Sequence, residues 1–193
     1  MEGVAAVLAD AVGALERDEI PYVLVGGLAS SLYGRPRTTR DVDLLVRKDD
    51  AKRALEALDT VGFETEETNP EWIFKAWRDD VTIDVIFWLK GDIYLDDEML
   101  ARSRLLDLEG VIVNVVPPED LVVIKAAVHD EQTPRHWHDA LGVIADNELD
   151  WDYLTRRARH SARRVLALLV YAQSNDLVVT DDVVRSLFDS VYG

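Results

Sequence analysis

The sequence contains no cysteine. A chain without thiols forms no disulfide, offers no thiolate to a metal and has no cysteine nucleophile, so these classes of site are excluded. Long apolar runs are missing too, and none approaches the roughly 20 residues needed to cross a bilayer. Acidic Glu2 and Asp10 stand where a secretory leader carries basic residues. We therefore expect a cytoplasmic protein with no membrane partner.

Basic residues are also scarce. The 193 residues include 21 Lys and Arg against 37 Asp and Glu, a net charge of −16. The average field of such a protein repels nucleic acid, so an RNA partner requires a local basic patch. Apolar residues make up 48% of the chain. This is enough for a core in one domain, or in a catalytic domain with a helical extension.

The first part of the chain alternates helical and extended patterns. We expect helices at residues 3–16, 28–33 and 50–61, strands at 22–25 and 41–46, and hairpins at 72–88 and 105–116. From Pro118 onward only helices are expected. These patterns predict an α/β (α+β) fold, a mixed sheet flanked by helices and followed by a C-terminal bundle of about four helices. The predicted domains are 1–117 and 118–193, sharing one cleft.

Two carboxylates stand two residues apart in the strand DVDLLV. Residues at that spacing share a face, so Asp41 and Asp43 lie side by side and repel each other. A magnesium ion between them removes the repulsion. The alternative is that Asp41 belongs to a turn and that Asp43 is simply solvated.

A third carboxylate, Asp84, lies in the apolar strand VTIDVIFW, where an unpaired charge is costly to bury. If this strand lies beside DVDLLV, three carboxylates form a cluster that suits two-metal phosphoryl or nucleotidyl transfer. The alternative is an aspartate at a solvated sheet edge. The segment VLVGGLASSLYG adds a glycine pair, Gly26 and Gly27, where backbone N–H groups at a helix start can approach phosphate.

The segment from Gly26 to Val46, GGLASSLYGRPRTTRDVDLLV, resembles the signature of the DNA polymerase beta-type nucleotidyltransferase superfamily. In that superfamily a glycine pair precedes a D-x-D motif, and a third carboxylate lies on a later strand. The R-x-T-x-D-V-D-L form, from Arg37 to Leu44, is similar to the AbiEii and MenT toxin-like branch. The resemblance covers roughly the first 140 residues.

The resemblance assigns functions to individual residues. It implies a catalytic and metal-binding set of Asp41, Asp43 and Asp84, and a nucleotide-binding set of Gly26, Gly27, Ser30, Arg37, Thr39, Lys125 and Asp139. Ser30 or Ser31 would replace the serine that the family often has where this chain has Gly27. For Lys125 and Asp139, an ion pair between helices is the alternative.

The implied enzyme is a metal-dependent nucleotidyltransferase. It moves a nucleoside monophosphate from a nucleoside triphosphate (NTP) to an acceptor hydroxyl and releases pyrophosphate, with one or two Mg²⁺ ions or Mn²⁺ in their place. The resemblance favours a tRNA acceptor and a toxin with a cognate antitoxin protein. Two alternatives stay open: a non-catalytic nucleotide-binding or antitoxin-type module, and a nucleotidyltransferase for a small molecule such as an antibiotic.

One basic segment stands out, RRARHSARR at residues 156–164. If residues 154–169 form one helix, its arginines make a basic face that suits RNA, and Arg156, Arg159 and Arg163 are the candidate contacts. The alternative is a solvated face whose arginines pair with nearby acids. His136 and His138 lie two apart on an expected helix and point about 200° apart, so we do not expect them to bind zinc together.

Overall fold

The computed structural model describes residues 2–36 and 39–193, which fall into two compact units. The first unit takes the chain up to Leu32, then Pro36–Leu89 and Tyr94–Pro117. The second takes Tyr33–Arg35, Lys90–Ile93 and Pro118–Gly193. That residues 1–117 carry catalysis and residues 118–193 close the cleft stays a prediction.

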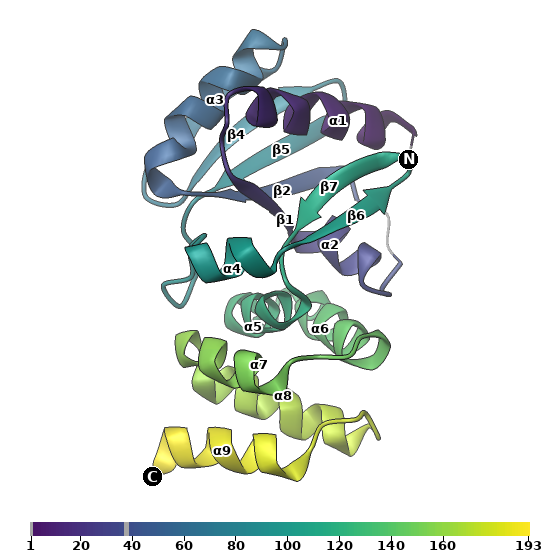
Figure 1. Ribbon diagram of the computed structural model, residues 1–193, viewed down its shortest axis with the longest axis vertical. Helices are drawn as coiled ribbons and strands as arrows, with labels where there is room; N and C mark the ends of the chain where they lie inside the picture. Colours follow the sequence, from purple (N-terminus) through teal and green to yellow (C-terminus); the bar gives the residue numbers. More distant parts are fainter. Residues whose placement is uncertain (1, 37–38) are drawn as a thin grey trace. The chain divides into compact units, whose positions relative to one another are not determined.

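Seven strands of the described chain form one mixed sheet in the first unit (Figure 1). The strands are β1 (Tyr22–Val25), β2 (Asp41–Val46), β3 (Glu64–Asn69), β4 (Ile73–Arg78), β5 (Val81–Ile86), β6 (Arg104–Leu108) and β7 (Val111–Val115). Their order across the sheet is β3-β4-β5-β2-β1-β7-β6. The pairs β2–β5 and β1–β7 are parallel, and the other pairs are antiparallel. The expected α/β class and both expected hairpins are confirmed.

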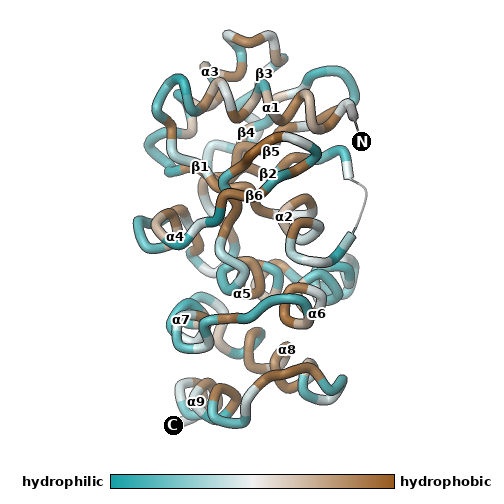
Figure 2. The backbone as a smooth tube through the Cα atoms, turned by 45° about the vertical axis from the view of Figure 1, so that its right-hand side comes forward, coloured by the Kyte–Doolittle hydropathy of each residue, from teal (hydrophilic) through white to brown (hydrophobic). Residues whose placement is uncertain are grey.

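The central strands are apolar because helices cover the sheet on both faces. All four residues of β1 are buried, and Val42 and Leu44 of β2 are fully buried. Figure 2 shows how hydrophobic residues gather along these strands. The edge strand β3 reads ETEETN and was not expected from the sequence, since it has no apolar alternation. Charged residues suit a sheet edge, where they discourage pairing with another chain.

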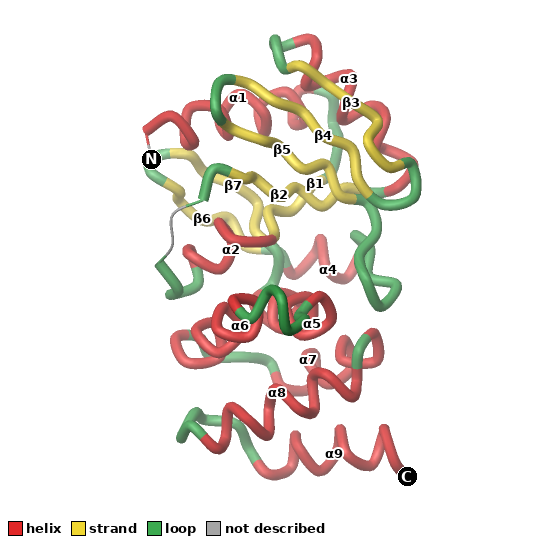
Figure 3. The backbone as a smooth tube through the Cα atoms, turned by 180° about the vertical axis from the view of Figure 1, so that it is seen from behind, coloured by secondary structure: helices red, strands yellow, loops and turns green. Residues whose placement is uncertain are grey.

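Helices of the first unit lie on both sides of the sheet (Figure 3). They are α1 (Glu2–Arg17), α2 (Gly26–Leu32), the 3₁₀ turn η1 (Lys48–Asp50), α3 (Ala51–Thr60) and α4 (Asp97–Arg102). Helices α1 and α3 contact each other and share one face, whereas α2 contacts β1 and β2 from the other. The face that carries α2 is the face of interest, since α2 begins at the glycine pair.

The second unit is helical. It contains α5 (Pro118–Val128), α6 (Arg135–Asp146), α7 (Trp151–Arg157), the 3₁₀ turn η2 (Ala158–His160), α8 (Ala162–Ser174) and α9 (Asp181–Tyr192). Helix α5 is buried along nearly its whole length because α6, α7 and α8 all pack against it. Helix α5 therefore has no solvated face, and its charged residues Glu119, Asp120 and Lys125 are buried with the apolar ones. In the described part of the chain, no helix is both long and apolar enough to pass through a membrane.

Candidate active site

Two of the predicted carboxylates lie on neighbouring strands. Strands β2 and β5 run parallel, and their register places Asp43 directly opposite Asp84 and Asp41 opposite Thr82. Opposite residues in a sheet point to the same face, so Asp43 and Asp84 lie side by side, both half-buried. Asp41 is exposed two residues earlier on the same face of β2. The fold therefore brings Asp43 and Asp84 together, and Asp41 lies further along the same face of β2.

The glycine pair lies against this carboxylate group. Gly26 directly follows β1 and begins α2 with φ +69°, a conformation that favours glycine. A Cβ at Gly26 would overlap the Asp43 carboxylate. Gly27 is buried in the first turn of α2. The backbone at the start of α2 can thus lie next to Asp43 because Gly26 has no side chain.

Ser30 and Ser31 turn their hydroxyls back into α2. The Ser30 hydroxyl is fully buried and donates to the Gly26 carbonyl at 2.9 Å, and the Ser31 hydroxyl donates to the Leu28 carbonyl at 2.7 Å. Such bonds are common for serine inside a helix. Phosphate binding by Ser30 stays a prediction, and it would require the hydroxyl to leave this bond.

A lysine that was not predicted as a site residue lies beside Asp84. Lys75 on β4 is the register partner of Asp84, and its Nζ lies 2.5 Å from Asp84 Oδ1. The position of Lys75 opposite Asp84 could have been predicted from the two-residue turn at Asp79 and Asp80. A hairpin with that turn pairs residues symmetrically about it, so Asp84 faces Lys75.

The carboxylates supply some, but not all, of the ligands that a divalent cation needs. Among the described residues, no group of three or more histidine, aspartate or glutamate side chains is arranged to hold a metal ion. Magnesium, however, commonly takes one or two protein carboxylates together with waters and substrate phosphates, rather than a complete protein cage. Asp43 and Asp84 supply such a pair of hard oxygen donors from adjacent strands. The donor chemistry therefore suits magnesium or manganese, with waters or substrate phosphates as the remaining ligands.

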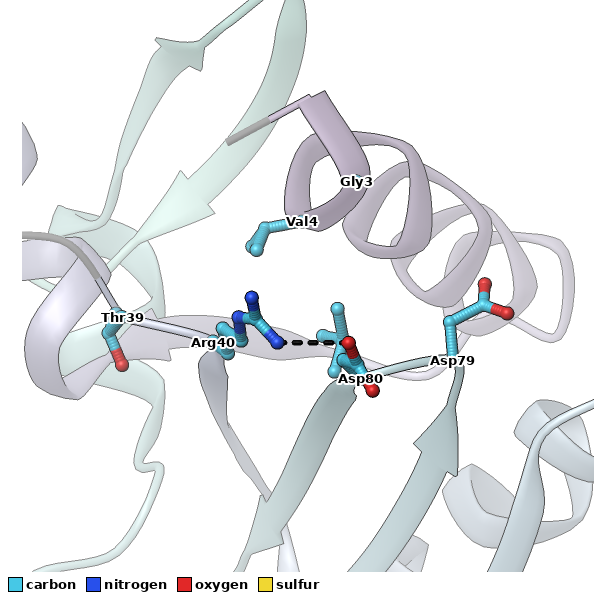
Figure 4. Close-up of a pocket in the computed structure, with 7 residues that line it drawn as sticks. Gly3, Val4, Thr39, Arg40, Asp79 and Asp80 are labelled. Carbon is cyan, nitrogen blue, oxygen red and sulfur yellow. Dashed lines mark hydrogen bonds and ion pairs between the residues drawn. The ribbon is translucent and has the colours of Figure 1, made fainter.

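A pocket of about 330 Å³ opens where β2 and β5 begin (Figure 4). It is lined by Gly3, Val4, Thr39, Arg40, Asp79, Asp80 and Val81. Arg40 points toward Asp80 and pairs with it at 3.0 Å. Thr39 accepts a hydrogen bond from the Asp41 backbone N–H through its Oγ1 at 3.1 Å, so it orients the start of β2. Arg37, also predicted to bind nucleotide, lies outside the described residues.

Lys125 and Asp139 belong to the second unit, where they form a buried ion pair. Lys125 Nζ lies 2.8 Å from Asp139 Oδ2, and the side chains are 2% and 4% exposed. Arg35 approaches the other oxygen of Asp139 at 3.9 Å. The helix-to-helix ion pair that was the alternative explanation is thus present. A contact of Lys125 with nucleotide stays a prediction.

The arginine-rich segment does not form one helix, which corrects the expectation for residues 154–169. Helix α7 ends at Arg157, a 3₁₀ turn follows, and α8 begins at Ala162 after Ser161 at φ −160°. Arg157 is 1% exposed and bonds Asp120 Oδ1 at 2.5 Å, while Tyr153 also donates to Asp120. A buried acid thus draws this arginine inward, away from any basic face.

The other arginines of the segment differ in their surroundings. Arg156, Arg159 and Arg163 are exposed. Arg156 lies over the Tyr153 ring at 5.5 Å, and Arg163 over the Tyr192 ring at 6.0 Å. Arg164 instead donates to the His129 carbonyl. The three candidate RNA contacts are therefore at the surface, but they do not line one continuous helix.

His136 on α6 is half-buried, and its Nδ1 is buried without a hydrogen-bond partner in the described chain. Burial lowers the pKa of His136 to about 4, with the positive charges of Lys125 and Arg135 acting in the same direction. A neutral imidazole is therefore expected at physiological pH. His138 is exposed on the same helix.

Solved structures with the same fold include an adenylyltransferase and a nucleotidyltransferase-like protein. The antibiotic-resistance factor ANT(2'')-Ia is 16% identical with a TM-score of 0.55, and the match covers 89% of this chain and 92% of that one. The lincosamide antibiotic adenylyltransferase LnuA is 13% identical with a TM-score of 0.54, over 74% and 97% of the two chains. An antigenic nucleotidyltransferase-like protein from Paracoccidioides brasiliensis is 18% identical with a TM-score of 0.57, over 97% and 93%. These likenesses establish the fold.

Residues 3–176 match the model of a family described as "Uncharacterised nucleotidyltransferase". The chain therefore belongs to this nucleotidyltransferase family, and it is an enzyme of nucleotidyl transfer. A search of curated proteins finds no significant match. The finer placement in the AbiEii and MenT branch stays a prediction.

Proposed function

We propose that this protein transfers a nucleoside monophosphate from an NTP to an acceptor hydroxyl and releases pyrophosphate. The observation that carries the proposal is the placement of Asp43 beside both Asp84 and Gly26. This arrangement puts carboxylates next to a strand-to-helix turn whose backbone can approach phosphate. The family assignment supports the reaction type.

In this proposal Asp43 and Asp84 hold a divalent cation, Mg²⁺ or Mn²⁺, with Asp41 at the exposed end of the group. When bound, the cation neutralises triphosphate charge and activates the acceptor hydroxyl. Asp84, on the strand next to β2, is the carboxylate we assign to the acceptor side. Gly26 and Gly27 leave room for the phosphates beside Asp43.

We infer that the acceptor is a small molecule rather than RNA. A net charge of −16 attracts cationic small molecules and repels RNA. The basic surface is smaller than the sequence suggested, because Arg157 is buried against Asp120 and Arg164 donates to the His129 carbonyl. Two proteins with this fold support the inference, since one is ANT(2'') in complex with adenylyl-2''-tobramycin and the other is LnuA with lincomycin bound.

A labelling experiment tests both parts. The protein is incubated with each α-³²P-labelled NTP and Mg²⁺, together with a panel of aminoglycosides and lincosamides, with total tRNA, or alone. We expect label on a small molecule. Label on tRNA would instead support the toxin-type activity with its antitoxin, and label on the protein itself would indicate self-modification.

Variants tie the activity to the site. Asp43→Asn and Asp84→Asn should abolish labelling while the chain stays folded, because each removes one carboxylate of the neighbouring pair. Asp59→Asn is the matched control, since Asp59 is exposed on α3 away from the sheet face described above. Nucleotide binding without any transfer in the unmodified protein would favour the non-catalytic module.

A further inference from the structure

Four charged residues form a row across four neighbouring strands. The sheet register places Glu66 of β3 opposite Lys75, Lys75 opposite Asp84, and Asp84 opposite Asp43. Side chains directly opposite each other share a face, and in the antiparallel pairs β3–β4 and β4–β5 their Cβ atoms lie about 4.5–5.5 Å apart. Lys75 therefore lies between two carboxylates, Glu66 on the edge side and Asp84 on the side of the candidate active site.

Lys75 is bonded to the inner of these two carboxylates. Its Nζ lies 2.5 Å from Asp84 Oδ1, and the side chains are 33% and 18% exposed. A second lysine pair in the same unit, Lys52 with Glu67, is longer at 3.2 Å and more exposed, at 69% and 48%. The Lys75 ammonium is thus paired with Asp84, a carboxylate that binds the metal in the proposed function.

We propose that Lys75 is a positioning residue that holds Asp84 while no metal is bound and shifts to Glu66 when a divalent cation binds Asp43 and Asp84. The inference rests on the proposed function. The ammonium neutralises one of two adjacent carboxylates, which lowers their mutual repulsion. An arriving dication attracts the same oxygens and repels the ammonium.

Glu66 gives the displaced lysine a second partner. Glu66 is exposed and is the register neighbour of Lys75 on the side away from Asp84, so a lysine side chain reaches it without any backbone change. Lys75 then competes with the metal, and Glu66 favours the metal-loaded state. This scheme predicts opposite effects for the two residues: removing Lys75 strengthens metal binding, and removing Glu66 weakens it.

The test measures Mn²⁺ binding to the protein without nucleotide, by electron paramagnetic resonance of free Mn²⁺. We expect Lys75→Met to bind Mn²⁺ about tenfold more tightly, equivalent to roughly 1.4 kcal/mol. Glu66→Gln should bind about threefold more weakly, as suits the loss of an exposed pair. The double variant should match Lys75→Met alone, because Glu66 acts only through the lysine. Lys75→Arg keeps the charge and should stay near the unmodified protein.

Lys52→Met is the matched control and should leave Mn²⁺ affinity unchanged. Unchanged or weaker Mn²⁺ binding by Lys75→Met would overturn the inference. Weaker NTP binding by Lys75→Met with unaltered Mn²⁺ affinity would also overturn it, because Lys75 would then be a nucleotide ligand. Should Lys75→Met fail to fold, Glu66→Gln decides, and an affinity equal to that of the unmodified protein overturns the inference. If the unmodified protein transfers label but the variants give these negative results, the inference about Lys75 is wrong and the proposed function stands. Absence of both Mn²⁺ binding and transfer overturns both.

Discussion

Gly26 lies directly against Asp43, so closely that a Cβ on the glycine would overlap the aspartate carboxylate. The preceding residue, Val25, is the register partner of Asp43 on β1. The glycine also has φ +69°, a backbone angle that residues with a side chain rarely adopt. Two independent features, backbone conformation and available space, thus require glycine where the chain passes from β1 into α2.

Gly26→Ala should lower the free energy of unfolding by about 1–3 kcal/mol, because alanine is strained at this φ. It should also displace the Asp43 carboxylate and reduce transfer. Urea denaturation and the labelling assay measure the two effects. Gly13→Ala is the control: Gly13 lies inside α1 with nothing within 4 Å of an added Cβ, so it should be neutral or slightly stabilising. A Gly26→Ala protein that is fully stable and active would contradict this account.

Lys125→Met should destabilise the second unit by about 3–5 kcal/mol, because it leaves the buried charge of Asp139 without its main partner. Urea denaturation measures the loss, and the double variant Lys125→Met, Asp139→Leu should recover much of it. The Michaelis constant for the NTP separates the two explanations of Lys125. An increase that persists in the folded double variant would show contact with nucleotide, and an unchanged constant would leave a structural ion pair.

The triple variant Arg156→Gln, Arg159→Gln, Arg163→Gln should change stability by less than about 0.5 kcal/mol, since all three side chains are exposed. Transfer to a small-molecule acceptor should stay unchanged. If tRNA is the acceptor, the same variant should lose RNA labelling and show a shallower dependence on salt.

Arg157→Gln, one position away from Arg156, should behave in the opposite way. It should cost about 3–5 kcal/mol of stability, because Asp120 is left buried without its ion-pair partner. Thermal unfolding compares this variant with the triple variant. Equal stability of the two would show that the inward position of Arg157 is wrong.

His136 makes stability depend on pH. The unfolded chain takes up this proton near pH 6.5 and the folded chain only near pH 4, because burial disfavours the imidazolium. Between these values the unfolded state binds more protons, so stability should fall as the pH drops from about 6.5 to about 4. Thermal unfolding across that range should show a shallower fall for His136→Gln than for His138→Gln, whose parent side chain is exposed. Equal pH profiles for the two variants would contradict the assignment.

Local spacing in the sequence determined which side chains share a strand face, how the hairpin is paired and where a helix begins. Asp41 and Asp43 share a face because strand side chains alternate, and the hairpin turn at Asp79 and Asp80 already specifies that Lys75 faces Asp84. The glycine pair predicts a helix start, which the structure has at Gly26. Neighbour geometry along a single segment is sufficient for each of these conclusions.

Only the tertiary structure decided which segments meet. Strand β5 lies parallel to β2, and this pairing, between residues about 40 positions apart in the chain, is what brings Asp84 beside Asp43. Arg157 was expected on a basic face, but Asp120 on another helix draws it into the interior. The periodicity of one segment predicts which side chains share a face. Whether that face meets water, a carboxylate or another strand depends on long-range packing, which no local pattern contains.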